Sequence, residues 1–118
     1  MRIHLIASLA CLGMAGFVHG QDAVQWTEAE GGNGHWYQGV VSYRTWQAAQ
    51  DLAVDAGGHL ATSTSEAENA YLVGIRDNQI EFGGAWIGLL QDPNGAEPDE
   101  GWRWITDEPL AWTNWRSN

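Results

Sequence analysis

The chain has 118 residues and carries 15 acidic side chains against 5 basic ones, a formal net charge of −10 at pH 7. This length suffices for one small domain and not for two. Nucleic acid and other polyanions are excluded as partners, because phosphate binding needs clustered basic side chains. An acid-rich domain of this size coordinates Ca²⁺, binds neutral ligands or is simply well solvated.

The N-terminal residues 1–20 predict a signal peptide. Arg2 supplies the positive end, an almost unbroken apolar run follows at residues 3–18, and cleavage is expected before Gln21. A membrane anchor is one alternative, but the run is shorter than the ~20 apolar residues that cross a bilayer. Cys11 permits a lipoprotein signal, a weaker alternative because it lies early in the run. We therefore expect a secreted or periplasmic protein, free of the membrane and of cysteine after cleavage.

The mature chain opens with a lead-in, residues 21–34, that ends in the turn cluster Glu-Gly-Gly-Asn-Gly. Residues 35–41, HWYQGVV, are rich in aromatic and β-branched side chains and predict a strand. A helix is expected after Thr45, a good N-cap, and it ends at a Gly-Gly pair, residues 57–58. Its apolar stripe needs a sheet or large rings close by and consists of Trp46, Ala49, Ala53 and Ala56.

The second half predicts one more helix and three extended segments. Residues 59–62 form a short extended piece, and Ser65 with Glu68 predicts a capping box, in which each side chain bonds the amide of the other residue. This helix is expected to end near residues 76–78. Its predicted buried face consists of Ala67, Ala70, Tyr71 and Ile75. Residues 85–90, AWIGLL, predict a strand buried on both faces, and WRWI at residues 102–105 predicts another.

The order of these elements resembles the C-type lectin-like domain. The segments that carry the resemblance are TWQAAQDLAVDAGGHLATSTSEAENAYL, AWIGL and GWRWITDEPLAWTNW, within residues 35–118. The resemblance implies an α+β fold with two helices flanking a small antiparallel sheet. It also implies a long-loop region, begun at the tryptophan-rich segment, that in many members holds Ca²⁺ and a sugar.

Two departures from the family pattern limit what the resemblance implies. Ala53 stands where animal members have a cysteine, which suggests a bacterial-type, cysteine-free variant. The family also continues beyond Thr-Asn-Trp with the segments that bind Ca²⁺ and sugar and with closing strands. We therefore interpret residues 35–118 as a fragment that lacks the main Ca²⁺ and sugar site. Residues 21–118 alone should leave the strands at 35–41 and 85–90 with unpaired edges and express poorly or form a molten species.

Oxygen-bearing side chains gather beside a Pro-Asn-Gly turn and could form a metal site. They are Asp92, Asn94, Glu97, Asp99 and Glu100. One interpretation is an auxiliary Ca²⁺ site at the base of the long loop. The spacing is not that of an EF-hand, and a solvated acidic loop is the simpler interpretation.

Four tryptophans lie within residues 101–115 and could stack on sugar rings. Core packing is the simpler role, because tryptophan is usually well buried. The resemblance makes Trp86, Trp104 and Trp115 packing residues, which leaves Trp102 and Trp112 as the rings expected to be more exposed.

The sequence assigns no catalytic, cofactor-binding or metal-binding residues. His35 and His59 share no catalytic or metal-binding spacing, and His59 is expected to bond the backbone. We predict an exported, non-enzymatic carbohydrate-recognition module whose partner is a glycan or a cell-surface protein, with Ca²⁺ a cofactor only in intact relatives. The alternative is a Ca²⁺-independent protein-interaction or structural module of the same fold. A glycosidase needs only two well-placed carboxylates, but no motif here supports one.

Overall fold

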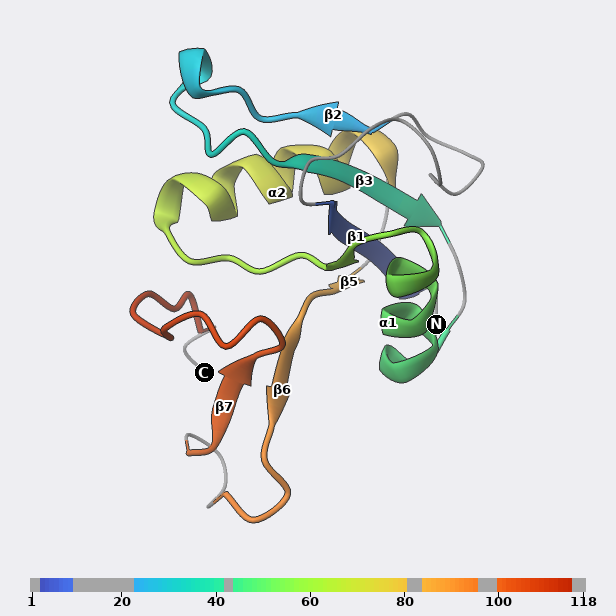
Figure 1. Cartoon of the computed structure of the whole chain (residues 1–118), viewed down its shortest axis with the longest axis vertical. Helices are drawn as coiled ribbons and strands as arrows, with labels where there is room; N and C mark the ends of the chain where they lie inside the picture. Colours follow the sequence, from blue (N-terminus) through green and yellow to red (C-terminus); the bar gives the residue numbers. More distant parts are fainter. Residues whose placement is uncertain (1–2, 10–22, 42–43, 81–83, 96–99, 116–118) are drawn as a thin grey trace.

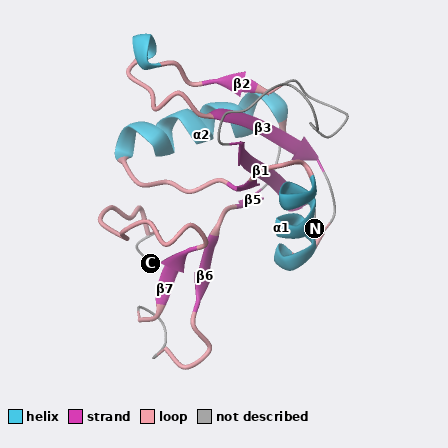
Figure 2. Cartoon of the chain, viewed as in Figure 1, coloured by secondary structure: helices cyan, strands magenta, loops and turns pink. Residues whose placement is uncertain are grey.

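The computed structural model describes residues 3–9, 23–41, 44–80, 84–95 and 100–115. In chain order its elements are β1 (Ile3–Leu9), β2 (Val24–Gln25), the 3-10 turn η1 (Glu28–Glu30), β3 (Trp36–Val41), α1 (Trp46–Asp55), β4 (His59–Leu60), α2 (Glu66–Gln79), β5 (Gly84–Trp86), β6 (Leu89–Gln91) and β7 (Trp102–Trp104). Figures 1 and 2 show a helix-and-sheet layer from β1 to β5 with a β6–β7 hairpin extending from it. This arrangement is the predicted α+β fold.

The N-terminal strand β1 is the centre of the five-stranded sheet. It pairs antiparallel with β3, from His4 opposite Val41 to Leu9 opposite Trp36, and antiparallel with the short β4. Its pairing with β5 is parallel, so the sheet is mixed where a purely antiparallel sheet was expected. In the whole chain β1 therefore covers the edges of β3 and β5 that we expected to be unpaired in residues 21–118. Cleavage of residues 1–20 stays a prediction.

Helix α1 forms as its sequence predicts. The Thr45 hydroxyl accepts a hydrogen bond from the Ala48 amide at 3.2 Å. Ala49 and Ala53 are buried against Leu60, with larger side chains of neighbouring segments packed around them. At the other end Gly57 adopts φ of +89°, a left-handed conformation that glycine reaches without strain. The small alanine side chains thus allow the helix to approach the sheet closely, as predicted.

The start of α2 differs from the predicted capping box. The Ser65 hydroxyl does accept from the Glu68 amide at 3.1 Å. The Glu68 carboxylate, however, accepts from the Thr64 amide at 2.8 Å and the Thr64 hydroxyl at 2.9 Å, and its other oxygen accepts from the Tyr37 hydroxyl at 2.8 Å. Asn33 adds a longer bond at 3.3 Å. Only half of the reciprocal arrangement forms, because the Glu68 carboxylate bonds Thr64 and Tyr37 instead of the Ser65 amide.

The buried face of α2 is also different from the prediction. It consists of Glu68, Leu72 and Ile75, with Tyr71 half-buried, whereas Ala67 and Ala70 are exposed. The helix is turned so that Glu68 faces β3, which is favourable because a buried carboxylate is tolerated once it is hydrogen-bonded. The lead-in also contributes, since Trp26 is buried and stacks on Tyr71 with ring centroids 5.0 Å apart.

The predicted strand AWIGLL divides at Gly88 into β5 and β6, which belong to different sheets. The Gly88 amide donates to the Ala61 carbonyl at 2.8 Å, and its own carbonyl accepts from the Ile105 amide at 2.9 Å. A Cβ at Gly88 would lie 2.8 Å from the Leu60 carbonyl oxygen, so only glycine fits this crossing. The strand residues on either side are only half-buried, and the prediction of burial on both faces was wrong.

Strand β6 pairs with β7, the predicted WRWI strand, in a two-stranded antiparallel sheet that places Leu89 opposite Trp104. The chain then runs from Ile105 back beside α2 (Figure 1). A hydrogen bond and a buried side chain hold this C-terminal segment in place. The Thr62 hydroxyl donates to the Glu108 carboxylate at 2.8 Å, and Trp104 is buried at the base of the hairpin.

Candidate functional site

The four tryptophans of the C-terminal segment occupy different depths. Trp104 is 2% exposed, Trp102 and Trp112 are half-buried, and Trp115 is 53% exposed. The prediction that Trp104 packs is confirmed, and that for Trp115 is wrong. Trp115 is exposed even though its ring contacts Trp102, with ring centroids 5.3 Å apart.

Trp86, also expected to pack, is half-buried against the cluster of Ala49, Ala53 and Leu60. Its indole N–H donates to the Arg44 carbonyl at 2.9 Å. The corresponding group of Trp46 donates to the Ile87 carbonyl at 2.8 Å. Both indoles therefore join α1 to the segment around β5, and their role is structural.

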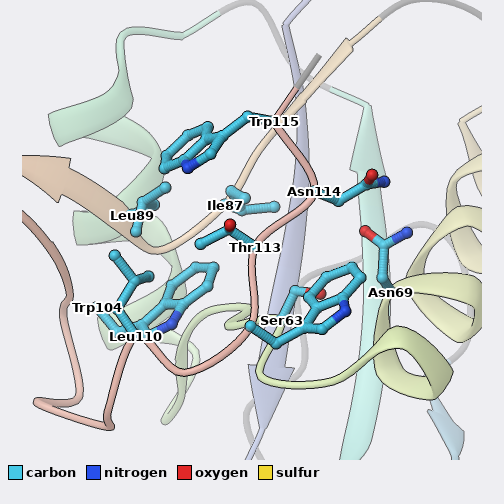
Figure 3. Close-up of a pocket in the computed structure, with 10 residues that line it drawn as sticks. Ser63, Asn69, Ile87, Leu89, Trp104, Leu110, Thr113, Asn114 and Trp115 are labelled. Atoms are coloured by element: carbon cyan, nitrogen blue, oxygen red, sulfur yellow. The ribbon is translucent and has the colours of Figure 1, made fainter. Parts of the chain in front are cut away.

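A pocket of about 90 Å³ lies between α2, the β5–β6 segment and the C-terminal loop. We call it the tryptophan pocket. Its apolar side comprises Ile87, Leu89, Trp104, Leu110, Trp112 and Trp115. Its polar side comprises Ser63, Asn69, Thr113 and Asn114. In Figure 3 the amides of Asn69 and Asn114 lie on the same side of the pocket, away from Trp104, Leu89 and Trp115.

Two buried polar atoms of this pocket have no hydrogen-bond partner. They are the Ser63 hydroxyl oxygen and the Trp104 indole nitrogen, on side chains whose residues are 6% and 2% exposed. An indole N–H only donates, whereas a hydroxyl both donates and accepts. Buried polar groups in proteins nearly always have partners, so these two atoms are exceptions among the described residues.

A second hollow of about 140 Å³ adjoins the tryptophan pocket. The two share Ser63, Asn69 and Ile87, and the second continues beside α2 as far as Arg76. The guanidinium group of Arg76 pairs with Asp77 at 2.7 Å on the exposed surface. The only cation that lines the second hollow among the described residues is therefore already paired.

The predicted acidic site is only partly within the described residues. Asp92 accepts from the amide of Asn94 at 2.8 Å, which closes the turn, and both side chains are exposed. Glu97 and Asp99 lie outside the described residues, and Glu100 is exposed at their edge. Across the part of the chain that the structure describes, no three His, Cys, Asp or Glu side chains are grouped as metal ligands.

The two histidines outside the leader lie apart from the tryptophan pocket. A ring nitrogen of His59 lies 2.8 Å from the Leu60 carbonyl oxygen, which confirms the predicted backbone bond. His35 packs against Tyr37 with ring centroids 6.5 Å apart. Neither residue lines the pocket.

The tryptophan pocket was not predicted from the sequence. The four rings were recognised as a group, but Ser63 and Asn69 were not connected with them, because they lie some forty residues earlier in the chain. The available signal was the unusual density of tryptophan, which indicates packing as readily as a site.

No helix among the described residues is long and apolar enough to cross a membrane.

A family model described as the lectin C-type domain matches residues 42–118. The chain belongs to the C-type lectin domain family. Among curated proteins, this lectin-domain chain is 34% identical to C-type lectin domain family 4 member F from Rattus norvegicus, over 71% of its length and 14% of the relative. It is 33% identical to family 4 member K from Homo sapiens, over 65% of its length and 21% of the relative.

Regenerating islet-derived protein 3-gamma from Homo sapiens is 30% identical over 70% of the lectin-domain chain and 49% of the relative. The chain thus spans less than half the length of each of these relatives. No solved structure matches it. The relatives are mammalian proteins, so the expectation of a bacterial-type variant finds no support.

Proposed function

We propose that this chain is an exported, non-enzymatic carbohydrate-recognition module of the C-type lectin class. The observation that carries the proposal is the family match over residues 42–118, a stretch that includes both helices and the whole tryptophan-rich segment. The partner proposed is a glycan, free or carried on a cell-surface protein. Export is part of the proposal because residues 1–20, which include β1 in the whole chain, have the composition of a signal peptide.

The geometry of the tryptophan pocket supports recognition of an uncharged ligand. The described residues that line it combine an apolar side with amide and hydroxyl groups and include no Asp, Glu or His. Such a lining suits a ligand with one apolar face and several hydroxyl groups, which describes a sugar ring. The same lining favours binding over acid–base chemistry, which needs a titratable group within hydrogen-bonding reach.

The proposal includes the interpretation that the main Ca²⁺ and sugar site of the family is not carried by these 118 residues and that they are a fragment of a lectin domain. The mass of the natural exported protein tests this. A mass clearly above that of residues 21–118 agrees with the interpretation, and a matching mass contradicts it.

A glycan array probed with the whole chain, in Ca²⁺ and in EDTA, tests carbohydrate recognition. Binding to a restricted set of glycans is expected. Trp115→Ala should weaken it, because this exposed ring flanks the pocket. Val54→Ala is the matched control, since Val54 is 55% exposed on α1 and lies outside the pocket. A protein partner retained in EDTA with no glycan bound would instead favour the protein-interaction alternative.

A further inference from the structure

Two asparagines of the chain are each followed by glycine, a dipeptide that is chemically reactive. They are Asn33, before Gly34, and Asn94, before Gly95. Because glycine has no side chain, its backbone nitrogen can approach the side-chain carbonyl carbon of the preceding asparagine. The other asparagines among the described residues precede larger side chains and are Asn69, Asn78 and Asn114.

The reaction is deamidation, which needs no reactant other than water. The glycine nitrogen forms a bond to the asparagine Cγ, the Cγ–Nδ2 bond breaks, and the side-chain amide leaves as ammonia with the proton of the glycine amide. Water then opens the cyclic imide at either of its carbonyls, which gives aspartate or isoaspartate. The chain gains one carboxylate, and nothing is oxidised or reduced. Hydrogen bonds that hold the glycine amide or the asparagine side chain slow the first step.

The fold holds Asn33 through contacts with distant parts of the chain. Its side-chain amide donates to the Tyr37 hydroxyl at 2.8 Å and to the Glu68 carboxylate of α2 at 3.3 Å. The attacking nitrogen, that of Gly34, donates to the carbonyl of the buried Trp26 at 2.8 Å. Ring closure at Asn33 therefore requires the lead-in to separate from α2, which opens part of the hydrophobic core.

The hydrogen bonds of Asn94 lie within one exposed turn. Its side-chain amide donates to the Asp92 carboxylate at 3.2 Å, and the Gly95 amide donates to the Asp92 carbonyl at 2.9 Å. Both Asn94 and Asp92 are exposed. A motion within this turn releases both bonds and leaves the core closed, so the open form costs much less free energy than at Asn33.

We propose that Asn94 is a site of spontaneous deamidation in the folded protein and that the hydrogen bonds around Asn33 protect it from the same reaction. The conversion places a new carboxylate beside that of Asp92 and removes the amide that donates to it. The turn after β6 thereby loses a hydrogen bond and gains a repulsion between like charges. Carbohydrate recognition is not needed for this reaction.

The test incubates the whole chain near neutral pH for several days and follows each asparagine by mass spectrometry of tryptic peptides. The chain has no lysine, so trypsin cuts only after arginine and separates Asn33, in residues 3–44, from Asn94, in residues 77–103. Asn94 should convert at least about tenfold faster, because each hydrogen bond that protects Asn33 lowers the open population by about threefold to tenfold. Asn78 is the internal control, since it is exposed on α2 but precedes Gln79, and it should remain unchanged.

Three variants separate the chemistry from its effect on the fold. Asn94→Gln should remove the reaction at this position, because the longer side chain cyclises far more slowly. Gly95→Ala is unsuitable, since its Cβ would lie 2.7 Å from the Glu100 carbonyl oxygen. Asn94→Asp mimics the product and should leave the melting temperature nearly unchanged. Asn33→Asp is the matched comparison and should lower it, because a carboxylate replaces the amide that donates to Glu68.

The whole chain unfolded in urea provides the reference rates. Asn33 and Asn94 should then convert at similar rates, because the same dipeptide has lost its hydrogen bonds in both places. In the folded chain, an unmodified Asn94, or conversion of Asn33 or Asn78 as fast as that of Asn94, would overturn the proposal. A difference between Asn33 and Asn94 that persists in urea would also overturn it, because the neighbouring sequence and not the fold would then decide the rates.

Discussion

Two neighbouring residues of α2 face two different kinds of buried polar environment. Glu68 points to β3, where Tyr37, Thr64 and Asn33 all donate to its carboxylate. Asn69 lines the tryptophan pocket, where the Ser63 hydroxyl and the Trp104 N–H have no partner. Consecutive helix residues are separated by about 100° around the axis, so one turn of α2 contributes to both.

The polar groups of these two regions differ in whether they have hydrogen-bond partners, and this decides whether they stabilise the fold. In the Glu68 cluster the buried Glu68 and Tyr37 bond each other, and Thr64 and Asn33 complete the carboxylate's hydrogen bonds, so its formation stabilises the fold. The tryptophan pocket contains a donor and a hydroxyl without partners, which lowers stability. We expect changes to the first region to reduce the free energy of unfolding and changes to the second to alter binding.

The largest expected effect concerns β1, on which the enclosed region depends. Deleting residues 1–20 removes the strand that joins β3, β4 and β5. We expect the cooperative transition to disappear, a loss comparable to the ~5–15 kcal/mol that stabilises a whole domain. Thermal denaturation followed by near-ultraviolet circular dichroism measures this, and a sharp melt of residues 21–118 would contradict it.

A matched pair of prolines localises that effect within the whole chain. Ile6→Pro removes a backbone donor in the middle of the central strand and should be severely destabilising. Leu9→Pro, at the end of the same strand, should be tolerated much better. Equal melting temperatures for the two variants would mean that β1 does not contribute to the sheet.

The next effect concerns the hydrogen bond between Tyr37 and Glu68. Tyr37→Phe keeps the ring and removes the donor that lies 2.8 Å from the carboxylate. Because the acceptor is a buried carboxylate, we expect a loss of about 1.5–3 kcal/mol in the free energy of unfolding, measured with urea. Glu30→Gln is the control, since this exposed carboxylate accepts from the Thr27 amide and hydroxyl and should change stability by at most ~0.5 kcal/mol. Similar losses in the free energy of unfolding for both variants would contradict a special role for the buried Tyr37–Glu68 bond.

Two adjacent buried hydroxyls provide a sharper comparison. Thr62 donates to Glu108 at 2.8 Å, whereas Ser63 has no partner. Thr62→Val should cost about 1–3 kcal/mol, because the hydroxyl bonds a carboxylate. Ser63→Ala should leave the free energy of unfolding unchanged or raise it slightly, because its hydroxyl has no partner to lose. Urea denaturation of both variants measures the difference, and a larger loss for Ser63→Ala would show that its hydroxyl is structural.

The smallest expected effect is a pH dependence in the enclosed region. Burial, reinforced by the negative charge of Glu30, raises the pKa of Tyr71 above its usual value of 10.0. The unfolded chain then ionises this phenol first, so its contribution is fully present below about pH 10 and is lost as the pH rises through the folded-state pKa. Melting temperatures measured across this range should fall less steeply in Tyr71→Phe. Identical slopes for the two proteins would contradict the prediction.

The sequence predicted the local elements better than their assembly. Thr45 and the alanine stripe correctly gave α1, because capping and periodicity act within a few residues. The buried face of α2 was predicted correctly at Ile75 and wrongly at Ala67 and Ala70, because Glu68, expected only as a capping residue, is buried instead. Its burial depends on Tyr37, thirty-one positions earlier, and no local pattern reports such a partner.

By itself, the sequence determined the α+β class, both helices, the β7 strand and membership of the C-type lectin domain family, since these follow from short-range chemistry and from motif order. Only the tertiary structure decided that AWIGLL divides at Gly88 and that Trp115 is exposed while Trp104 is buried. It alone joined Ser63 and Asn69 to the tryptophans in one pocket. The physical reason is that burial and hydrogen bonding depend on tertiary contacts between distant segments, and such contacts leave no local pattern in the sequence.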